Sequence, residues 1–497
     1  MRYAFQFKVN FRGGIVSPGN LLHICEAVET AGIEHVRFGL RQQLLIDATH
    51  KNYDKLIAAF NNSQIIYEVN KDEYPNIVSS YAAEEIFIQD SWLKEGTYKD
   101  IFDLIDYEPQ LKLNFSDSNQ TFSPFFTGHI NWIASKSAQY WYLYIRFPKT
   151  KLLYQWPHLV YTNDVSRVSK TVEALILGNK KAFFDNVNAD GLLLFQKALS
   201  EITVISKTIG EPLHLPHFNL PYYEGFNSYG NKTWLGIYKR DELFSIDFLK
   251  DIATACLQTK VGQLYTTPWK SIIIKNIEKQ DKQFWDNILG KYRINVRHSA
   301  NELAWQVEDN NEDGLGIKRH IIRELDKQDV RTFGLCFGVN TQPESSMFGS
   351  VIIQRQFANI RGQVKALDKF DILHTKNFNP NIYDYVVFRN DIPKDYLDTY
   401  LISLIKYYYE VQKANEIAID KAFAIKQVTN ETLNEQLVQQ CSVCLTVYDA
   451  AIGDASMQIL PNITFEDLPE DYCCPLCEAP KSAFKNIVAN SLYLQVH

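Results

Sequence analysis

The sequence lacks the long apolar segments that direct a chain to a membrane. No apolar run approaches the length of about 18 residues that a transmembrane helix needs. The amino terminus, MRYAFQFKVNFRGG, has no apolar core of signal-peptide length. We therefore expect a cytoplasmic protein without membrane insertion, whose cysteines are reduced thiols available to a metal rather than paired in disulfides.

An excess of basic charge is also missing. The chain has 51 Lys and Arg against 58 Asp and Glu, a net charge of −7, and no basic segment typical of nucleic-acid binding. Seven acidic residues and one lysine give residues 441–484 a net charge of −6. So acidic a segment favours electrostatic docking on a basic partner surface, the alternative being an ordinary solvated surface.

Cysteine is scarce until the last part of the chain. Residues 1–440 contain three, and the other five lie between Cys441 and Cys477. Cys441-x-x-Cys444 and Cys474-x-x-Cys477 each form a short chelating turn, and two such turns can place four thiolates tetrahedrally around one metal. Four sulfurs in this geometry indicate zinc or iron, which the spacing alone does not separate.

The segment CSVCLTVYDAAIGDASMQILPNITFEDLPEDYCCPLCEAPKSAF closely resembles rubredoxin. The resemblance implies one iron that cycles between ferric and ferrous, held by Cys441, Cys444, Cys474 and Cys477, with Cys473 at a non-ligand position. A redox-silent zinc knuckle is the alternative. The residues that carry the resemblance are Tyr448-Asp449, Gly453-Asp454, Pro461, Phe465 to Pro469, Tyr472, Cys474-Pro475, Cys477, Lys481 and Phe484.

Two positions depart from the rubredoxin pattern. Leu445 and Glu478 follow the second cysteine of each turn, where that family usually has a glycine whose N–H points at sulfur. A non-glycine residue with positive φ is uncommon and strained. The departures could alter the hydrogen bonds to sulfur, which tune the reduction potential.

The rest of the chain contains a repeat. Residues 17–46 and 245–274 each begin with a serine suited to cap a helix, continue with an apolar helical stripe, and lead into two strand-like runs. Gly32 ends the first helix and Gly262 lies near the corresponding place in the second. The repeat predicts a tandem α+β duplication with a period of about 230 residues, with Cys25 and Cys256 as core residues.

The repeat resembles the ferredoxin-like half-domains of sirohaem nitrite and sulfite reductases. VRFGLRQQLLI, with Arg41-Gln42, is similar to that family's strand–turn–strand, and LYTTPWKSIII, with Thr267 to Lys270, is similar to its second copy. The resemblance to the two families implies half-domains at 1–70 and 206–278, sirohaem-reductase-like lobes at 71–205 and 279–412, a helical connector at 413–436, and a rubredoxin-like domain at 437–488.

The reductases hold a four-iron cluster on four cysteines, one of which also ligates the sirohaem iron. Residues 1–440 offer Cys25, Cys256 and Cys336, and four thiolates cannot come from three. The cluster is therefore expected to be missing unless another chain contributes. We interpret the body as a reductase-like scaffold that lost its catalytic centre and gained a rubredoxin.

The reductases also surround the eight sirohaem carboxylates with Arg and Lys. Arg41 and Lys270, in the two motif turns, are the cofactor-binding candidates that the resemblance implies, whereas LKLN at 111–114 does not reproduce the family's paired lysines and argues against sirohaem. For the other basic residues near such places, solvated surface charge is the alternative. They are Arg37, Lys112, Lys136, Arg146, Arg355 and Arg361.

The joint between body and tail has no proline or glycine over 394–440. Leu397, Leu401, Leu404 and Tyr408 have helical spacing, and Thr432 and Glu435 could form a capping box. We therefore expect the tail to be held by helices rather than by a flexible linker; the alternative, which is compatible with this, is that the helices complete the second lobe.

Two hypotheses on function remain from the sequence. In the first, the rubredoxin centre relays single electrons to a reductase that docks on the acidic tail, in nitrite or nitrate assimilation or in sulfite reduction. In the second, the body binds sirohaem or a related tetrapyrrole, or is a non-catalytic reductase-like subunit, and the tail is a structural metal knuckle.

Overall fold

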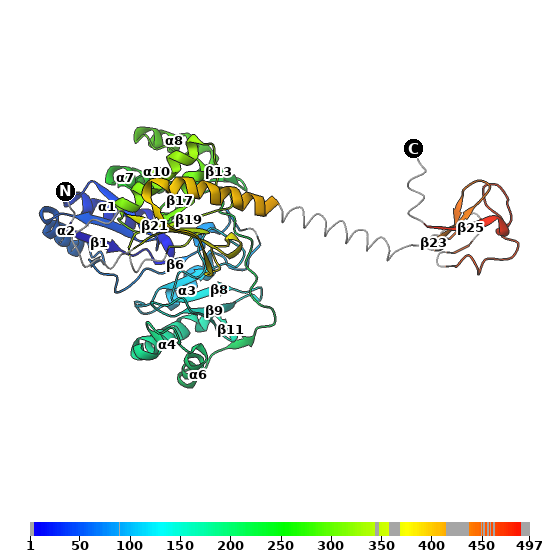
Figure 1. Ribbon diagram of the computed structural model, residues 1–497, viewed down its shortest axis with the longest axis horizontal. Helices are drawn as coiled ribbons and strands as arrows, with labels where there is room; N and C mark the ends of the chain where they lie inside the picture. The colour runs from blue at the N-terminus through cyan, green and yellow to red at the C-terminus, as the bar shows by residue number, and fades with distance from the viewer. Residues whose placement is uncertain are drawn as a thin grey trace. The chain divides into compact units, whose positions relative to one another are not determined.

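The computed structural model describes residues 4–88, 90–342, 347–356, 368–413, 437–448, 450, 453–454, 457, 459–460 and 463–488. The chain divides into two compact units, Met1–Ile405, called the body here, and Lys406–His497, called the C-terminal unit (Figure 1). Within the described ranges, no helix combines the length and apolar character that a membrane crossing requires. The finer domain boundaries expected from the sequence stay predictions.

The first half-domain follows the sequence expectation closely. Ser17 Oγ accepts a hydrogen bond from Asn20 N–H at 3.2 Å, and Pro18 takes the first helical position. Gly32 has a φ of +73° and ends the helix in the left-handed region. The elements are β1 (Phe5–Val9), η1 (Arg12–Gly14), β2 (Ile15–Val16), α1 (Pro18–Thr30), β3 (His35–Phe38), β4 (Leu44–Ala48), α2 (His50–Asn62) and β5 (Glu68–Val69).

The second half-domain repeats this order with one difference at the end of its helix. Ser245 Oγ accepts from Phe248 N–H at 3.4 Å, as predicted. The left-handed residue after the helix, however, is Lys260, with a φ of +57°, and not Gly262, because the helix ends earlier than the glycine indicated. The elements are β13 (Gly225–Tyr229), β14 (Lys232–Ile237), β15 (Phe244–Ser245), α7 (Ile246–Gln258), β16 (Leu264–Thr266), β17 (Ile272–Glu278) and α8 (Lys282–Lys291).

The two half-domains exchange strands. β15 of the second pairs antiparallel with β3 of the first, and β2 of the first pairs antiparallel with β16 of the second. The sheets therefore run β15-β3-β4-β1-β5 and β13-β14-β17-β16-β2. α1 and α7 pack side by side (Figure 1), and one hydrophobic core takes residues from both halves, including Cys25 and Cys256. The two thiols are core residues, as predicted.

Each half-domain leads into a lobe, and the lobes repeat one strand pattern. In the first lobe β6, β7 and β8 are parallel neighbours and β9 returns antiparallel. β12 and β11 extend this seven-stranded sheet, in which β10 also pairs with β9. Its elements are β6 (Val78–Ser79), η2 (Tyr81–Ala83), α3 (Glu95–Leu104), β7 (Leu113–Ser116), β8 (Ile130–Ala134), β9 (Tyr140–Arg146), β10 (Leu153–Gln155), β11 (His158–Tyr161), η3 (Thr162–Asp164), α4 (Val165–Gly178), α5 (Lys180–Phe183), α6 (Gly191–Glu201) and β12 (Ser206–Thr208).

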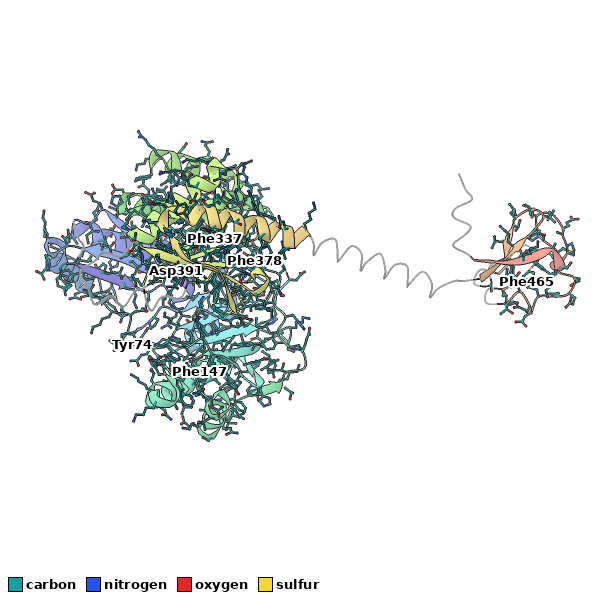
Figure 2. The ribbon with its side chains drawn as sticks, viewed as in Figure 1. Tyr74, Phe147, Phe337, Phe378, Asp391 and Phe465 are labelled. Carbon is teal, nitrogen blue, oxygen red and sulfur yellow. The ribbon has the colours of Figure 1, made fainter. Side chains whose placement is uncertain are left out.

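The second lobe has the same parallel, parallel, antiparallel sequence in β18-β19-β20-β21-β22. Phe337, labelled in Figure 2, lies on β19. It stacks on Trp305 of β18 with ring centroids 4.6 Å apart. The duplication thus extends through the lobes and confirms the tandem α+β expectation. Its elements are α9 (Ala300–Leu303), β18 (Trp305–Val307), α10 (Glu312–Lys327), β19 (Phe337–Asn340), β20 (Val351–Arg355), β21 (Lys369–Thr375), η5 (Lys376–Phe378), β22 (Tyr385–Pro393) and η6 (Lys394–Tyr396), whereas η4 (Lys279–Asp281) directly precedes α8 of the second half-domain.

A helix described over 397–413 follows the second lobe. Leu397, Leu401, Leu404 and Tyr408 are buried on one side of it, as their spacing predicts. The remainder of the predicted connector, including the Thr432 and Glu435 capping box, lies outside the described residues.

The C-terminal unit is a small antiparallel sheet, β24-β23-β25, with long turns. Its elements are β23 (Leu437–Cys441), β24 (Val447–Tyr448), η8 (Lys481–Ala483) and β25 (Phe484–Val488). Phe465 is at the centre of its aromatic core (Figure 2), with ring centroids 5.7 Å from Tyr448, 6.1 Å from Tyr472 and 5.1 Å from Phe484.

Gln42 ties the two half-domains and the first lobe together. Its fully buried amide donates to Ser79 O at 3.1 Å and to Thr266 O at 2.9 Å, and its carbonyl accepts from Ser79 N–H at 2.9 Å. The three contacts join the first repeat to β6 of the lobe and to β16 of the second repeat.

Replacing this amide should destabilise the body. Gln42→Ala leaves one buried N–H and two buried carbonyls without this partner, so we expect the free energy of unfolding to fall by about 3 kcal/mol. All eight tryptophans lie in the body, so urea unfolding followed by their fluorescence reports on it alone. Gln258→Ala, at an exposed position of α7, is the control and should change little. Equal effects of both variants would contradict the assignment.

Candidate metal centre and a cationic cluster in the body

Four sulfurs converge in the C-terminal unit. The Sγ atoms of Cys441, Cys444, Cys474 and Cys477 all lie within 4.8 Å of one another. Cys441 Sγ is 3.7 Å from Cys477 Sγ, and Cys444 Sγ is 3.4 Å from Cys474 Sγ. A tetrahedron with metal–sulfur bonds of about 2.3 Å has edges of about 3.8 Å. The four thiols therefore fit a single four-coordinate metal.

Two tight turns hold the sulfurs in place. Leu445 N–H donates to Cys441 O at 2.9 Å, and Glu478 N–H donates to Cys474 O at 2.9 Å. Leu445 and Glu478 adopt φ values of +63° and +57°, the left-handed conformation that suits glycine. Each non-glycine residue in this conformation costs about 1–2 kcal/mol, so the turns are strained where the sequence departs from the rubredoxin pattern.

The structure distinguishes the two adjacent cysteines. Cys474 is buried, and its sulfur belongs to the group of four. Cys473 is half-buried, and its thiol donates to Asp471 O at 3.4 Å instead. Cys474 is therefore positioned as a ligand and Cys473 is not, as the resemblance implied.

One side of the centre reaches the surface. Cys441 and Cys474 are buried, whereas Cys444 and Cys477 are partly exposed. Val443 and Leu476, inside the two chelating turns, are 68% and 74% exposed. The metal site therefore lies beneath an apolar surface formed by the turns.

A second group of charged residues gathers in the body, at one end of the first-lobe sheet. Arg41, in the turn between β3 and β4, donates from Nη2 to Asn76 O at 2.6 Å and to Leu113 O at 3.1 Å. Lys112 precedes β7, and its backbone N–H donates to His129 Nδ1 at 3.1 Å. Arg146, at the end of β9, lies over the Tyr383 ring at 4.9 Å. We call Arg41, Lys112, His129 and Arg146 the cationic cluster.

The pKa values show that positive charge is in excess there. Burial, with smaller contributions from Lys112, Arg41 and Arg146, lowers the pKa of His129 to about 3. Burial and the nearby Arg41 also lower the pKa of Lys112, and burial lowers that of Arg41 to about 10. Arg41 donates to carbonyl and amide oxygens, which satisfy its N–H groups without neutralising its charge. Such a cluster favours a bound anion.

Lys270, the other candidate, has a different environment. Its buried ammonium group lies 2.8 Å from Glu242 Oε2 and 3.3 Å from Asp309 Oδ1. The two carboxylates raise the pKa of Lys270 although its burial opposes this. Lys270 thus lies in a compensated ion-pair network, and its predicted role in cofactor binding stays a prediction, as does that of Arg41.

The other basic candidates do not join the cluster. Arg37 pairs with Glu312 at 2.9 Å, Lys136 pairs with Glu211 on the surface, and Arg355 pairs with Asp368 at 3.3 Å. Arg361 lies outside the described residues. His129 and Asp309 were not predicted from the sequence, because no motif spacing links them to the turns of Arg41 and Lys270, near which they lie in the structure.

The three body thiols lie in two separate cores. Cys25 and Cys256 belong to the shared half-domain core, whereas Cys336 belongs to the core that includes the first-lobe sheet, with its sulfur 3.6 Å from Ser350 Oγ. Burial raises the pKa of Cys25 and of Cys336 to about 12. These thiols do not have the surroundings of a four-cysteine cluster site.

Comparison with known proteins identifies the C-terminal segment. The rubredoxin family model matches residues 439–484. The high molecular weight rubredoxin of Moorella thermoacetica is 36% identical over 81 residues, which are 16% of this chain and 35% of the relative. Probable rubredoxin HupI of Bradyrhizobium diazoefficiens is 52% identical over 48 residues, 10% of this chain and 70% of the relative. Probable rubredoxin HupJ of Rhodobacter capsulatus is 44% identical over 55 residues, 11% of this chain and 20% of the relative. The chain spans about a third or less of the Moorella and Rhodobacter proteins.

A solved structure resembles the body. The NirA protein of Mycobacterium tuberculosis superposes with a TM-score of 0.61 and 14% sequence identity, over 81% of this chain and 80% of that one. An identity this low establishes the fold alone. The likeness confirms the predicted fold class, and the four cysteines of the C-terminal unit form a typical single-iron rubredoxin site.

The two neighbouring cysteines can be separated by mutation. Cys474→Ser removes one of four ligands, so we expect iron content to fall more than tenfold, whereas Cys473→Ser should keep its iron and its visible charge-transfer bands. Metal analysis of the full chain by mass spectrometry, with absorption spectra, measures both. Equal metal loss in the two variants, or zinc as the native metal, would contradict the assignment.

Proposed function

Because the chain belongs to the rubredoxin family through residues 439–484, we propose that it is an electron-transfer protein that relays single electrons to a partner reductase. When bound between the four thiolates, iron supplies a one-electron ferric/ferrous couple. The observation that carries the proposal is the convergence of four sulfurs directly beneath a surface. The fold likeness favours nitrite or nitrate assimilation, or sulfite reduction, as the pathway.

The surface above the centre suits a brief encounter with another protein. Cys444 and Cys477 are the two partly exposed ligands, and Val443 and Leu476 surround them with apolar contact area. A partner that covers these side chains would exclude water and bring its own redox group near the sulfurs. Apolar contact at the centre with charge at the rim is the usual composition of a transient interface.

Acidic residues give the same C-terminal unit a negative surface. Glu466, Asp467, Glu470 and Asp471 are all exposed. Lys481 offsets one of these charges, because its donation to Leu468 O at 2.7 Å leaves the ammonium group positive. A basic docking face on the partner would still be attracted to this negative surface at long range, which speeds association.

The body supports a docking or delivery role better than catalysis. Three thiols in two cores do not provide the four ligands of a four-iron cluster, so the chain lacks a local source of rapid multi-electron delivery. Nitrite or sulfite reduction would then occur on the partner, with electrons arriving one at a time.

Electrostatic steering gives the first test. We expect electron transfer from the reduced protein to cytochrome c, a basic one-electron acceptor, to slow as salt rises, because the Debye length is about 10 Å at about 0.1 M salt. Changing Glu466, Asp467, Glu470 and Asp471 together to lysine should lower the second-order rate constant by about 10- to 100-fold at low salt. Stopped-flow absorbance measures this rate.

Four exposed carboxylates of the body provide the matched control. Asp54, Asp100, Asp103 and Asp286, changed together to lysine, make the same change in net charge outside the C-terminal unit and should have a much smaller effect. Equal slowing by both sets would mean that net charge alone matters. Turnover of nitrite or sulfite by the purified chain with an artificial electron donor would overturn the relay proposal.

A second function, binding of sirohaem or a related tetrapyrrole, is favoured by the cationic cluster. A polycarboxylate would pair with Arg41 and Lys112, whose charges are close enough to lower the pKa of His129. Lys112 Nζ has no hydrogen bond or ion pair to another described residue. The positive charges therefore fit the carboxylates of such a ligand. The four thiolates that hold an iron–sulfur cluster beside sirohaem in the reductases are not matched, because residues 1–440 contain three cysteines.

Lys112 tests this second function with two readouts. Its lowered pKa means that the folded body disfavours the charged lysine, so Lys112→Met should raise the stability of the ligand-free protein by about 0.5–2 kcal/mol. The same change should weaken sirohaem binding at least tenfold in an absorbance titration. Lys136→Met, which removes a surface lysine paired with Glu211, should do neither. Unchanged sirohaem affinity in Lys112→Met would contradict the proposed site.

A further inference from the structure

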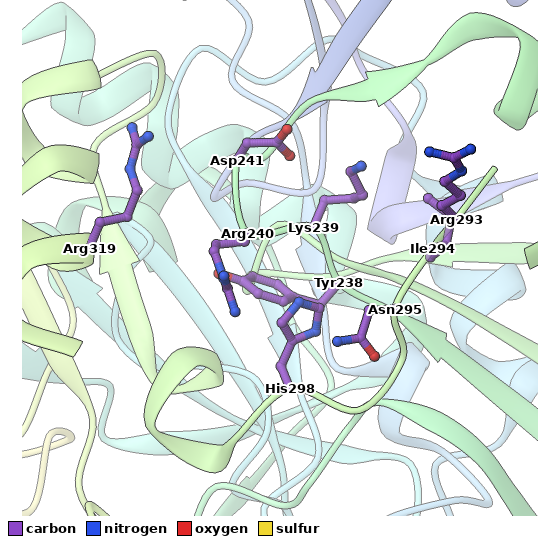
Figure 3. Close-up of a pocket in the computed structure, with 9 residues that line it drawn as sticks. All are labelled: Tyr238, Lys239, Arg240, Asp241, Arg293, Ile294, Asn295, His298 and Arg319. Atoms are coloured by element: carbon purple, nitrogen blue, oxygen red, sulfur yellow. The ribbon is translucent and has the colours of Figure 1, made fainter. Parts of the chain in front are cut away.

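A second basic surface lies on the second half-domain, in a pocket distinct from the cationic cluster. It has a volume of about 320 Å³ and opens to solvent (Figure 3). Three segments line it, namely residues 238–241 after β14, residues 293–298 after α8, and Arg319 on α10. The volume is at the lower end of the range of about 300–1,000 Å³ that is usual for ligand pockets.

The floor of the pocket is rigid and hydrogen-bonded. His298 Nδ1 lies 2.5 Å from Glu224 Oε1, and the His298 ring packs edge-on against Tyr238 with centroids 5.2 Å apart. Lys318 Nζ, which is not part of the pocket lining, donates to the Tyr238 hydroxyl at 2.7 Å. The two rings at the base of the pocket are therefore fixed before any ligand arrives, which reduces the entropy lost on binding.

The basic side chains around this floor are not all neutralised. Arg240 forms a bidentate pair with Glu302, and Arg319 pairs with Glu312 at 3.2 Å. Lys239 and Arg293 have no carboxylate within ion-pair distance among the described residues. The one acid in the lining, Asp241, already accepts from Leu243 N–H at 3.3 Å. Lys239 and Arg293, which form no ion pair with a described residue, thus border a concave site in a chain whose net charge is negative.

Arg293 occupies a backbone position at which glycine would be favoured. It follows the end of α8 with a φ of +52°, and Arg293 N–H and Ile294 N–H donate back to Gly290 O and Leu289 O. This is the hydrogen-bond pattern of a helix end that prefers glycine in the left-handed position. An arginine there strains the backbone by about 1–2 kcal/mol and directs a long cationic side chain into the pocket lining.

We propose that this pocket binds a small metabolite through a tetrahedral oxyanion, a phosphoryl or sulfuryl group, held between Lys239 and Arg293. A guanidinium and an ammonium group provide charge-assisted donors of the kind that bind such anions. Tyr238 and His298, with their rings perpendicular to one another, offer aromatic edges for contact with the remainder of the molecule. The site is independent of the electron-relay function proposed above, because none of its residues lies in the C-terminal unit.

The chain contains a matched pair of positions for the experiment. Lys260 follows α7 as Arg293 follows α8, with a φ of +57° and the same two backbone hydrogen bonds, from Lys260 N–H to Leu257 O and from Val261 N–H to Cys256 O. Arg293→Gly and Lys260→Gly therefore each remove one positive charge and relieve the same backbone strain. Only Arg293 lines the pocket, so loss of binding in its variant cannot be attributed to misfolding.

Calorimetric titration of the iron-loaded full chain with pyrophosphate and with sulfate tests the proposal. We expect one site for pyrophosphate, about tenfold weaker binding in Arg293→Gly and in Lys239→Gln, and unchanged binding in Lys260→Gly. Tighter binding of pyrophosphate than of sulfate would identify a phosphoryl ligand, and the reverse order a sulfuryl ligand. The proposal is overturned if neither probe binds, if Lys260→Gly weakens binding as much as Arg293→Gly, or if Lys112→Met alone abolishes it, which would place the anion in the cationic cluster.

Discussion

The exchange of strands between the two half-domains is the constraint on which the rest of the body depends. β2 belongs by sequence to the first repeat and by hydrogen bonding to the second, and β15 does the reverse. Because each sheet is completed by the other repeat, neither half can close its core alone, and α1 and α7 are held together at its centre. The turns that follow these helices are therefore fixed relative to both lobes, and they bring Arg41 and Lys270 to their positions.

The turns that contain Arg41 and Lys270 differ in whether the buried positive charge is paired with carboxylates. In the first, Arg41 donates to neutral oxygens and lies near Lys112, so that two positive charges are close together. The second buries Lys270 between Glu242 and Asp309, where the charge is balanced within the fold. A complete ion pair does not require a ligand, whereas the charges of Arg41 and Lys112 would be stabilised by an anion. The two copies of the turn therefore differ in whether the fold itself pairs the buried positive charge.

Structural features that depend on residues close together in the sequence were predicted correctly. The Ser17 and Ser245 caps, the apolar stripes with Cys25 and Cys256, and the chelating turns follow from spacing alone, since their partners lie a few residues away. The strand exchange could not be predicted, because two-residue strands leave no periodic pattern and pair across about 230 residues. His129 and Asp309 were missed for the same reason. Gly262 lies near the end of the second helix, as expected, but the left-handed position itself is filled by Lys260.

Adjacent thiols make the order of folding and metal loading matter. In an unfolded chain Cys473 and Cys474 have the same reach, so a metal ion that arrives early has two ways to complete a four-sulfur set. Once Cys474 N–H donates to Ala479 O at 2.8 Å and Glu478 N–H to Cys474 O, one sulfur faces the other three and its neighbour lies against Asp471 O. Loading after folding is therefore unambiguous, whereas loading during synthesis requires that a wrong thiolate be displaced by the right one.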